Sequence, residues 1–181
     1  MNRRRSIRLK DYDYSQPGAY FVTICTRNRE RVLGEIVGGT VTLSPVVDLV
    51  QTTWLAIRHN YPGVDVDEFI VMPSHLHGII LLTGATDLGK ADQDQGEAIG
   101  QARGPGPTSP LPDVVHRFKS LTTARYRQGV KRDGQLRSSD RLWQRNYYEQ
   151  VIRDDDDLDR VREYIAGNPA SWDDDEYNPN G

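Results

Sequence analysis

The chain has 181 residues, of which 36% are hydrophobic, and it holds 23 Lys and Arg against 26 Asp and Glu. This length suits one domain that buries about 70% of its unfolded surface, and it is too short for two domains of ordinary size. Its apolar runs end far below the roughly 20 residues that cross a bilayer, and a single cysteine, Cys25, excludes an internal disulfide, so a soluble cytoplasmic protein is expected.

The first half of the chain predicts strands around one helix. Residues 19–26 follow the turn dipeptide Pro17-Gly18 and are β-branched and aromatic, which predicts a central strand. Further elements are expected in chain order: a hairpin from 32–36 and 40–43, a helix from Pro45 to about residue 58, and strands at 66–72 and 76–82.

The second half alternates helical spacing with polar segments. Residues 84–107 lack apolar periodicity, which predicts a flexible insertion within a single domain of residues 1–172. Helical spacing resumes at Val114 and again after Asp154, and residues 173–181 predict an acidic disordered tail. Strands broken by helices, with hairpins among them, indicate an α+β, ferredoxin-like fold whose helices pack on one face of an antiparallel sheet.

Two histidines begin the predicted strand at residues 76–82. In His75-Leu76-His77 both imidazoles share one face, because alternate residues of a strand point the same way. Two neutral imidazoles so placed can chelate one divalent cation. The triplet alone is equally explained by hydrogen-bonded histidines within the sheet, so a metal site requires further ligands from elsewhere in the chain.

The helix predicted after Asp154 supplies candidate partners for the histidines. Its opening aspartates suit the positive end of the helix dipole. At 100° per residue, Tyr164 and Asn168 lie about 40° apart and border one apolar stripe together. A phenol can attack a phosphate whose charge is withdrawn by a metal, and an amide oxygen is a ligand for Mg²⁺ or Mn²⁺. Taken alone, Tyr164 is also explained as a packing residue.

Basic and aromatic residues lie together in the cationic part of the chain. Residues 154–181 hold ten acids against two bases, whereas residues 1–153 hold 21 bases against 16 acids. Residues 113–150 interleave bases with aromatic rings, which suits a phosphate backbone and stacked bases, so single-stranded nucleic acid is a candidate partner. The alternatives are a solvated charged face and, for the aromatic residues, a half-buried strand.

Five blocks of sequence carry a family resemblance. They are residues 17–23, 69–79, 118–120, 143–148, and 164–165 with 168–169. In this order they resemble the REP-associated and related single-tyrosine transposases, a branch of the HUH (histidine, hydrophobe, histidine) endonucleases. The blocks span most of the chain, which makes the resemblance far more specific than the histidine triplet alone.

The resemblance implies a ferredoxin-like fold, a site and a substrate. His75 and His77 would hold a divalent metal, Mg²⁺ or Mn²⁺, with Asn168 as the third protein ligand. Tyr164 would attack single-stranded or hairpin DNA, leaving a 5′-phosphotyrosine and a free 3′-hydroxyl. A homodimer is left open, and a nucleoid-associated protein is expected. Candidate DNA contacts are Arg3, Arg4, Arg5, Arg117, Lys119, Arg125, Trp143, Arg145, Tyr147 and Tyr148.

Two departures from the family pattern keep alternatives open. Relatives usually have His where this chain has Gln150, and a bulkier or polar residue at Gly167, where Gly can loosen the helix by about 1 kcal/mol. A second hypothesis is therefore a protein that binds DNA hairpins without cutting them. A metal-dependent oxygenase of the cupin kind shares the histidine pair, but it needs many short barrel strands where this sequence predicts helices.

Overall fold

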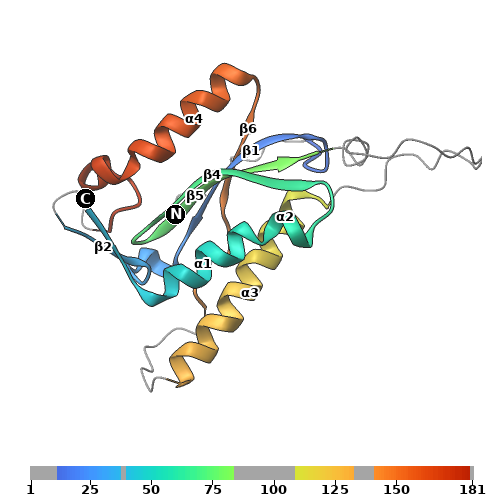
Figure 1. Cartoon of the computed structure of the whole chain (residues 1–181). Coiled ribbons are helices and arrows are strands. Elements are labelled where there is room, and N and C mark those ends of the chain that lie inside the picture. Colours follow the sequence, from blue (N-terminus) through green and yellow to red (C-terminus); the bar gives the residue numbers. More distant parts are fainter. Residues whose placement is uncertain (1–11, 38–39, 84–108, 133–140, 180–181) are drawn as a thin grey trace, which may run out of the picture.

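The computed structural model describes residues 12–37, 40–83, 109–132 and 141–179 (Figure 1). In chain order the elements are β1 (Gly18–Cys25), η1 (Arg27–Arg29), β2 (Gly34–Val37), β3 (Thr40–Leu43), α1 (Pro45–Leu55), α2 (Ile57–Asn60), β4 (Val64–Met72), β5 (His75–Leu82), α3 (Leu111–Arg132), β6 (Tyr148–Ile152), α4 (Asp155–Gly167) and η3 (Asn168–Asp174). The predicted insertion at residues 84–107 lies outside the described residues.

Four antiparallel strands form the main sheet in the order β4-β5-β1-β6, so β1 is an interior strand as predicted. Together with α1 and α3 they make the β-α-β-β-α-β succession of a ferredoxin-like fold. The predicted hairpin forms a separate two-stranded sheet, β2-β3. The predicted helix after Pro45 is divided at Ala56, where α1 ends and the short α2 begins.

Helices cover both faces of the sheet, whereas the sequence predicted one covered face. Helices α1 and α3 pack on the face that carries Tyr20, Val22 and Leu76. Helix α4 packs on the opposite face through Ile165, and Figure 1 shows it across the sheet from α3. The physical reason is that both alternate sets of residues on β1 and β5 are apolar, so each face must be removed from water.

Close packing at Gly78 joins β5 to α1. The fully buried Trp54 ring occupies the space beside this glycine, and a methyl group added to Gly78 would overlap the ring and lie 3.1 Å from the Phe69 Cβ. Only a residue without a side chain fits there. The residue that follows His77 therefore fixes how closely α1 approaches the strand that carries the histidines.

Charged groups hold helix α4 at its start and again within its second half. At its start, the Asp154 side chain accepts a hydrogen bond of 2.8 Å from the Asp157 backbone N–H, which is an N-cap. Farther along, Arg162 contacts Asp67 with 2.5 Å between Nη2 and Oδ2. Asp67 lies at a β-bulge of β4, where the register shifts between Val66 and Phe69.

The chain beyond α4 corrects the prediction of a disordered acidic tail. The helix η3 extends to Asp174. Beyond it, the Tyr177 carbonyl accepts a hydrogen bond from Ser74 at 2.8 Å, and the Asn178 amide donates to the Trp172 carbonyl at 3.0 Å. Trp172 and Asn178 are buried among charged neighbours, so local composition alone indicated a solvated segment. Among the residues that the structure describes, no helix has the length and apolar character needed to cross a membrane.

Candidate active site

His75 and His77 lie side by side on β5, on the face of the sheet that α4 covers. Both side chains are fully buried, and their ring centroids are 4.4 Å apart. The Phe21 ring stacks on His77 at 5.4 Å, and the Trp172 ring stacks on His75 at 6.1 Å. The predicted common face of the two imidazoles is confirmed, and aromatic rings on both sides keep water from them.

A serine determines which nitrogen of His75 carries the proton. The Ser74 hydroxyl donates its one proton to the Tyr177 carbonyl at 2.8 Å, so at 3.3 Å from His75 Nδ1 it can only accept. His75 Nδ1 is then the protonated nitrogen, and Nε2 presents a lone pair. Nε2 is buried without a hydrogen-bond partner in the described part of the chain, 3.8 Å from Asp175 Oδ2.

His77 is oriented by a threonine on the neighbouring strand. The distance between His77 Nδ1 and the Thr23 hydroxyl is 2.8 Å, and both groups are buried. The other ring nitrogen, Nε2, points to the Tyr164 hydroxyl at 3.5 Å. Hydrogen bonds of this kind, made by the outer nitrogen of a histidine, are typical of imidazoles that bind a metal through the inner one.

Burial keeps both imidazoles neutral at pH 7. It lowers the pKa of His77 to about 3, and burial together with the nearby His77 and Arg29 lowers the pKa of His75 well below its usual value. Neutral imidazole is the form that binds metal ions, because binding must otherwise displace a proton. Both rings are therefore in the unprotonated form that a metal ion requires.

The tyrosine of α4 reaches the same place. Tyr164 packs edge-on against Phe21 at 5.9 Å and against His77 at 5.3 Å, while 48% of the residue remains exposed. Burial of its hydroxyl end and the charge of Asp175 raise the pKa of Tyr164 above its usual value. The hydroxyl is thus protonated at neutral pH and lies beside an imidazole, on a side chain that is about half exposed.

Two side chains complete the group of candidate metal ligands. Asn168 directly follows α4 with helical backbone angles, and its buried Oδ1 lacks a hydrogen-bond partner among the described residues. One ligand atom each from His75, His77 and Asp175 lie within 4.8 Å of one another. Ligands bound at about 2.1 Å to one ion are spaced roughly 3–4 Å apart, so these residues fit a small divalent cation.

Asp175 is the ligand candidate that the sequence analysis missed. It was counted within an acidic tail, where nothing in its neighbours distinguishes it from Asp173 or Asp174. It reaches the histidines because residues 168–178, here called the C-terminal turn, fold back over β5. Arg31 Nη2 donates to Asn178 Oδ1 at 2.7 Å, and Arg29 donates to the Glu176 carbonyl, so this turn is fastened to residues 29–31.

The predicted DNA contacts separate into groups. Arg3, Arg4 and Arg5 lie outside the described residues. Lys119, Trp143, Arg145 and Tyr147 come together between α3 and the segment that leads into β6. Arg117 faces the Tyr61 ring, Arg125 donates to Thr53, and Tyr148 packs near Phe21 on the histidine face. Trp143 is buried and donates its indole N–H to Thr122 at 2.7 Å, which gives it a structural role.

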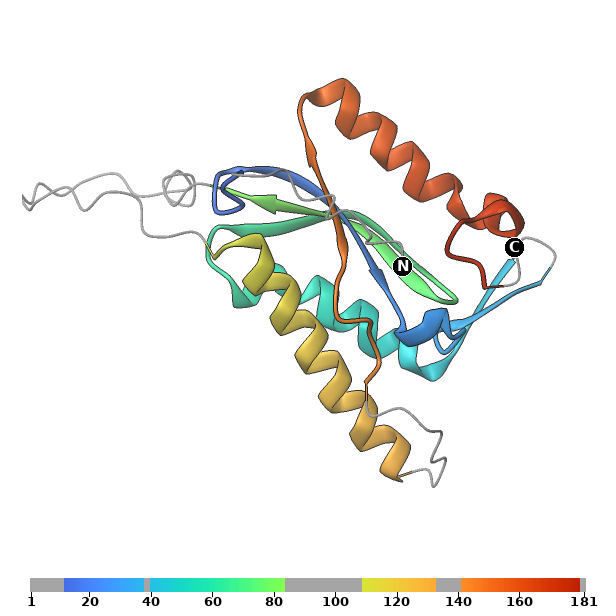
Figure 2. The same ribbon diagram turned by 180° about the vertical axis from the view of Figure 1, so that it is seen from behind.

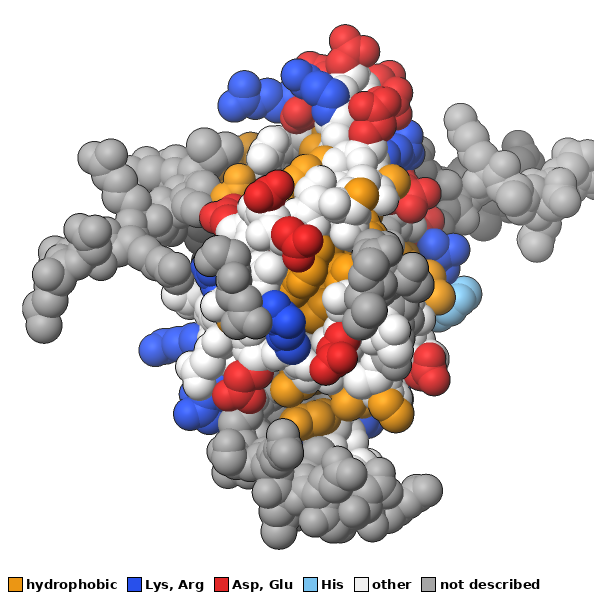
Figure 3. All heavy atoms as spheres, turned by 90° about the vertical axis from the view of Figure 1, so that its left-hand side faces the viewer, with side chains coloured by type: hydrophobic (Ala, Val, Ile, Leu, Met, Phe, Trp, Pro, Cys, Tyr) orange, Lys and Arg blue, Asp and Glu red, His pale blue; other side chains and the backbone are white. Residues whose placement is uncertain are grey.

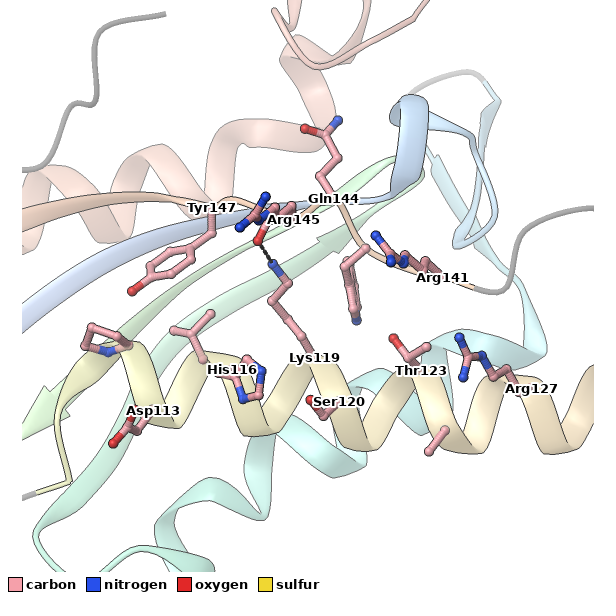
Figure 4. Close-up of a pocket in the computed structure, with 14 residues that line it drawn as sticks. Asp113, His116, Lys119, Ser120, Thr123, Arg127, Arg141, Gln144, Arg145 and Tyr147 are labelled. Atoms are coloured by element: carbon pink, nitrogen blue, oxygen red, sulfur yellow. Dashed lines mark hydrogen bonds between the residues drawn. The ribbon is translucent and has the colours of Figure 1, made fainter.

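Lys119, Trp143, Arg145 and Tyr147 line a pocket of about 660 Å³ beside α3 (Figure 4). Sequence reasoning missed several residues that line it: His116, Ser120, Thr123, Arg127, Arg141 and Gln144. The helical members recur every three or four residues from His116 to Arg127, a spacing that would have identified one face of α3. Figure 3, turned by 90° from the view of Figure 1, shows a face on which acidic, basic and apolar side chains are intermingled.

Comparison with known proteins places the chain in a family and a fold. No protein-family model matches it. It is 36% identical over 176 residues to an uncharacterized protein of Haemophilus influenzae, which covers 97% of this chain and 93% of that protein. Among solved structures it is similar to a REP-associated tyrosine transposase bound to a REP hairpin, with a TM-score of 0.54 and 19% identity over 90% of this chain and 74% of that one. The common fold is the one that the sequence resemblance predicted.

Proposed function

Because the chain belongs to one family with the Haemophilus influenzae protein and has the fold of a REP-associated tyrosine transposase, we propose that it cleaves and rejoins single-stranded or hairpin DNA through Tyr164. One observation carries the proposal. The hydroxyl of the half-exposed Tyr164 lies 3.5 Å from His77, one of two buried, neutral imidazoles that lie beside the Asp175 carboxylate. We propose that the protein acts on DNA in the cytoplasm.

In the proposed step the Tyr164 oxygen attacks a DNA phosphorus. The new bond is P–O of a 5′-phosphotyrosine, and the bond that breaks joins phosphorus to the 3′ oxygen. The phenol proton leaves to solvent, and the departing 3′ oxygen takes up a proton to become a hydroxyl. Reversal by that hydroxyl rejoins the strand, because the covalent link conserves the phosphodiester bond energy.

The buried ligand set supports a divalent metal as part of the site. His75 and His77 would bind it through Nε2, with the Asp175 carboxylate or the Asn168 amide oxygen completing the protein ligands. When bound, such an ion withdraws charge from a phosphate and stabilises a leaving oxygen. The carboxylate and amide oxygens are ligands that suit Mn²⁺ and Mg²⁺.

The test is a covalent adduct that survives denaturation. Purified protein is mixed with Mn²⁺ and a labelled single-stranded oligonucleotide that contains a hairpin, and the products are separated under denaturing conditions. Tyr164→Phe should abolish the labelled protein band, at least a 10³-fold loss, because the substitution removes the oxygen that forms the covalent bond. Binding to the same oligonucleotide in a native gel should be retained.

A matched control and a rival outcome make the result decisive. Tyr126→Phe removes a phenol hydroxyl from α3 on the opposite face of the sheet, and its adduct should match that of the unaltered protein. An undiminished adduct from Tyr164→Phe would transfer the role of nucleophile to Tyr147 or Tyr148. Unaltered protein that shifts the hairpin but never forms an adduct would instead favour the non-cleaving binding protein.

A further inference from the structure

The pocket beside α3 is built between two segments that are distant in the chain. One wall is the face of α3 that carries His116, Lys119 and Arg127, and the other is the strand-like segment 141–147. Figure 2 shows this segment running along α3 before it enters β6. The Trp143 ring also lines the pocket and is held by its hydrogen bond to Thr122.

Lys119 holds the two walls together. Its ammonium donates to the Arg145 carbonyl at 2.9 Å, drawn as a dashed line in Figure 4, and lies 5.9 Å from the centre of the Tyr147 ring. Burial lowers the pKa of Lys119 to about 8, so it is still mostly charged at pH 7. The aromatic wall of the pocket is therefore held in place by a charged contact within the protein.

The lining is strongly cationic. Its charged residues are Lys119, Arg127, Arg141 and Arg145 against the single acid Asp113. An aromatic ring beside several guanidinium groups suits a polymer with alternating phosphates and flat bases, since phosphates neutralise the cations and every base can stack. Neither an acidic peptide nor free phosphate would make use of the aromatic wall.

The rim of the pocket leads to the histidines. The Gln144 backbone N–H donates to the Cys25 carbonyl at 2.9 Å, and Cys25 pairs directly with His75 across β1 and β5. Two strand spacings of about 4.8 Å therefore separate Gln144 from His75, roughly 10 Å in all. A single strand that fills the pocket can cross the end of β1 and reach Tyr164 within a few nucleotides.

We propose that this pocket binds unpaired nucleotides next to the phosphate that Tyr164 attacks, with a base on Tyr147 and the backbone on Arg127, Arg141 and Arg145. The inference rests on the proposed function for its link to cleavage, and it deepens that function by assigning the strand a path across the sheet edge. Arg127 and Arg141 are assigned to the substrate here by their place in the pocket and not by any sequence motif.

The experiment measures binding without cleavage. A fluorescent hexanucleotide of thymidines, which forms no hairpin, is titrated in EDTA against protein carrying Tyr164→Phe, and fluorescence anisotropy gives Kd at several salt concentrations. Adding Tyr147→Leu should weaken binding about tenfold by removing the stacking ring. Adding Arg127→Gln or Arg141→Gln should lower the slope of log K against log salt by about 0.7 each.

Matched controls separate the pocket from general charge. Arg160→Gln removes an exposed guanidinium from α4, where it pairs with Asp157, and should leave both Kd and the salt slope as in the Tyr164→Phe background. A duplex of six base pairs should bind more weakly than the single strand, because its bases cannot reach Tyr147. Pocket variants that bind the hexanucleotide as tightly as this background, or a duplex that binds equally well, would overturn the proposal.

Its failure and that of the proposed function are distinguishable. In protein that keeps Tyr164, the pocket variants should raise the hairpin concentration needed for half-maximal adduct formation while the maximal rate stays within about twofold, since the reacting groups are untouched. If the pocket variants form the adduct with the same dependence on hairpin concentration, the proposal for the pocket is wrong and the proposal of cleavage is unaffected. If hexanucleotide binding depends on Tyr147 but the protein that keeps Tyr164 forms no adduct, the proposal of cleavage is wrong and the proposal for the pocket is unaffected.

Discussion

At the scale of single residues, hydrogen bonds decide the chemistry of the site. Ser74 can donate only once, and because the Tyr177 carbonyl takes that proton, His75 must direct a lone pair at Asp175. The Nε2 lone pair, 3.8 Å from the Asp175 carboxylate, makes no hydrogen bond with it. A cation between them would satisfy both groups, which is why Asp175 joins the histidines as a proposed ligand.

The choice between Asp175 and Asn168 as main oxygen ligand can be measured. Asp175→Ala should weaken Mn²⁺ binding at least about tenfold in calorimetric titration at pH 7, because it removes a negatively charged ligand from a buried site. Asn168→Ala should weaken it less, since an amide is uncharged. Asp173→Ala, an exposed acid in the same turn, is the control, and equal Kd values for Asp173→Ala and Asp175→Ala would contradict the assignment.

Most of the residue-level site was predictable, and its missing member was not. The His75 and His77 pair follows from strand alternation, and Tyr164 and Asn168 follow from helical spacing, both of which depend on nearby residues. The structure brings these four side chains together, with the Asn168 side chain beside both His75 and Tyr164. The role of Asp175 could not be predicted, because its position depends on contacts that Arg29 and Arg31 make with the C-terminal turn. The residues in each contact are separated by 147 positions in the sequence.

At the scale of elements, glycines show where backbone approach matters and where it does not. Gly78 lies against Trp54, so β5 and α1 can be this close only without a side chain. Gly167 ends α4 with φ −80° and ψ −11°, and a Cβ added there would meet nothing within 4 Å. Packing therefore does not require glycine at position 167, where this chain departs from the family pattern.

These two positions make a matched pair for urea unfolding. Gly78→Ala should lower the free energy of unfolding by about 1–3 kcal/mol, because the added methyl group overpacks the core against Trp54. Gly167→Ala should raise it by about 0.5–1 kcal/mol, because the same change in a helical conformation reduces the entropy of the unfolded chain. If the two substitutions change the free energy of unfolding equally, the core around Gly78 accommodates a methyl group more easily than its geometry indicates.

At the scale of the whole molecule, one chain supplies every group of the candidate site that the structure describes. Helix α4 packs on its own sheet through Ile165, and the contact between Arg162 and Asp67 ties it to β4. This ion pair also lowers the pKa of Asp67, so it persists at neutral pH. Tyr164 therefore meets the histidines of its own chain.

Mixing two inactive proteins tests this arrangement. Tyr164→Phe lacks the nucleophile, and His77→Ala lacks a ligand, so neither should form an adduct alone. A site built within one chain predicts that the mixture also stays below about 1% of the activity of the unaltered protein, because no molecule then holds both groups. Adduct formation in the mixture, on the chain that carries Tyr164, would show that the tyrosine helix serves a partner.

Local spacing was sufficient to establish the succession of strands and helices, the shared face of the histidines and the pairing of Tyr164 with Asn168, because neighbours within a few residues determine these features. Long-range contacts decided the rest. They placed α4 on the second face of the sheet, turned the acidic C-terminal segment inward to deliver Asp175, and closed a cationic pocket between α3 and residues 141–147. Such outcomes depend on which distant surfaces bury one another, and no short stretch of sequence carries that information.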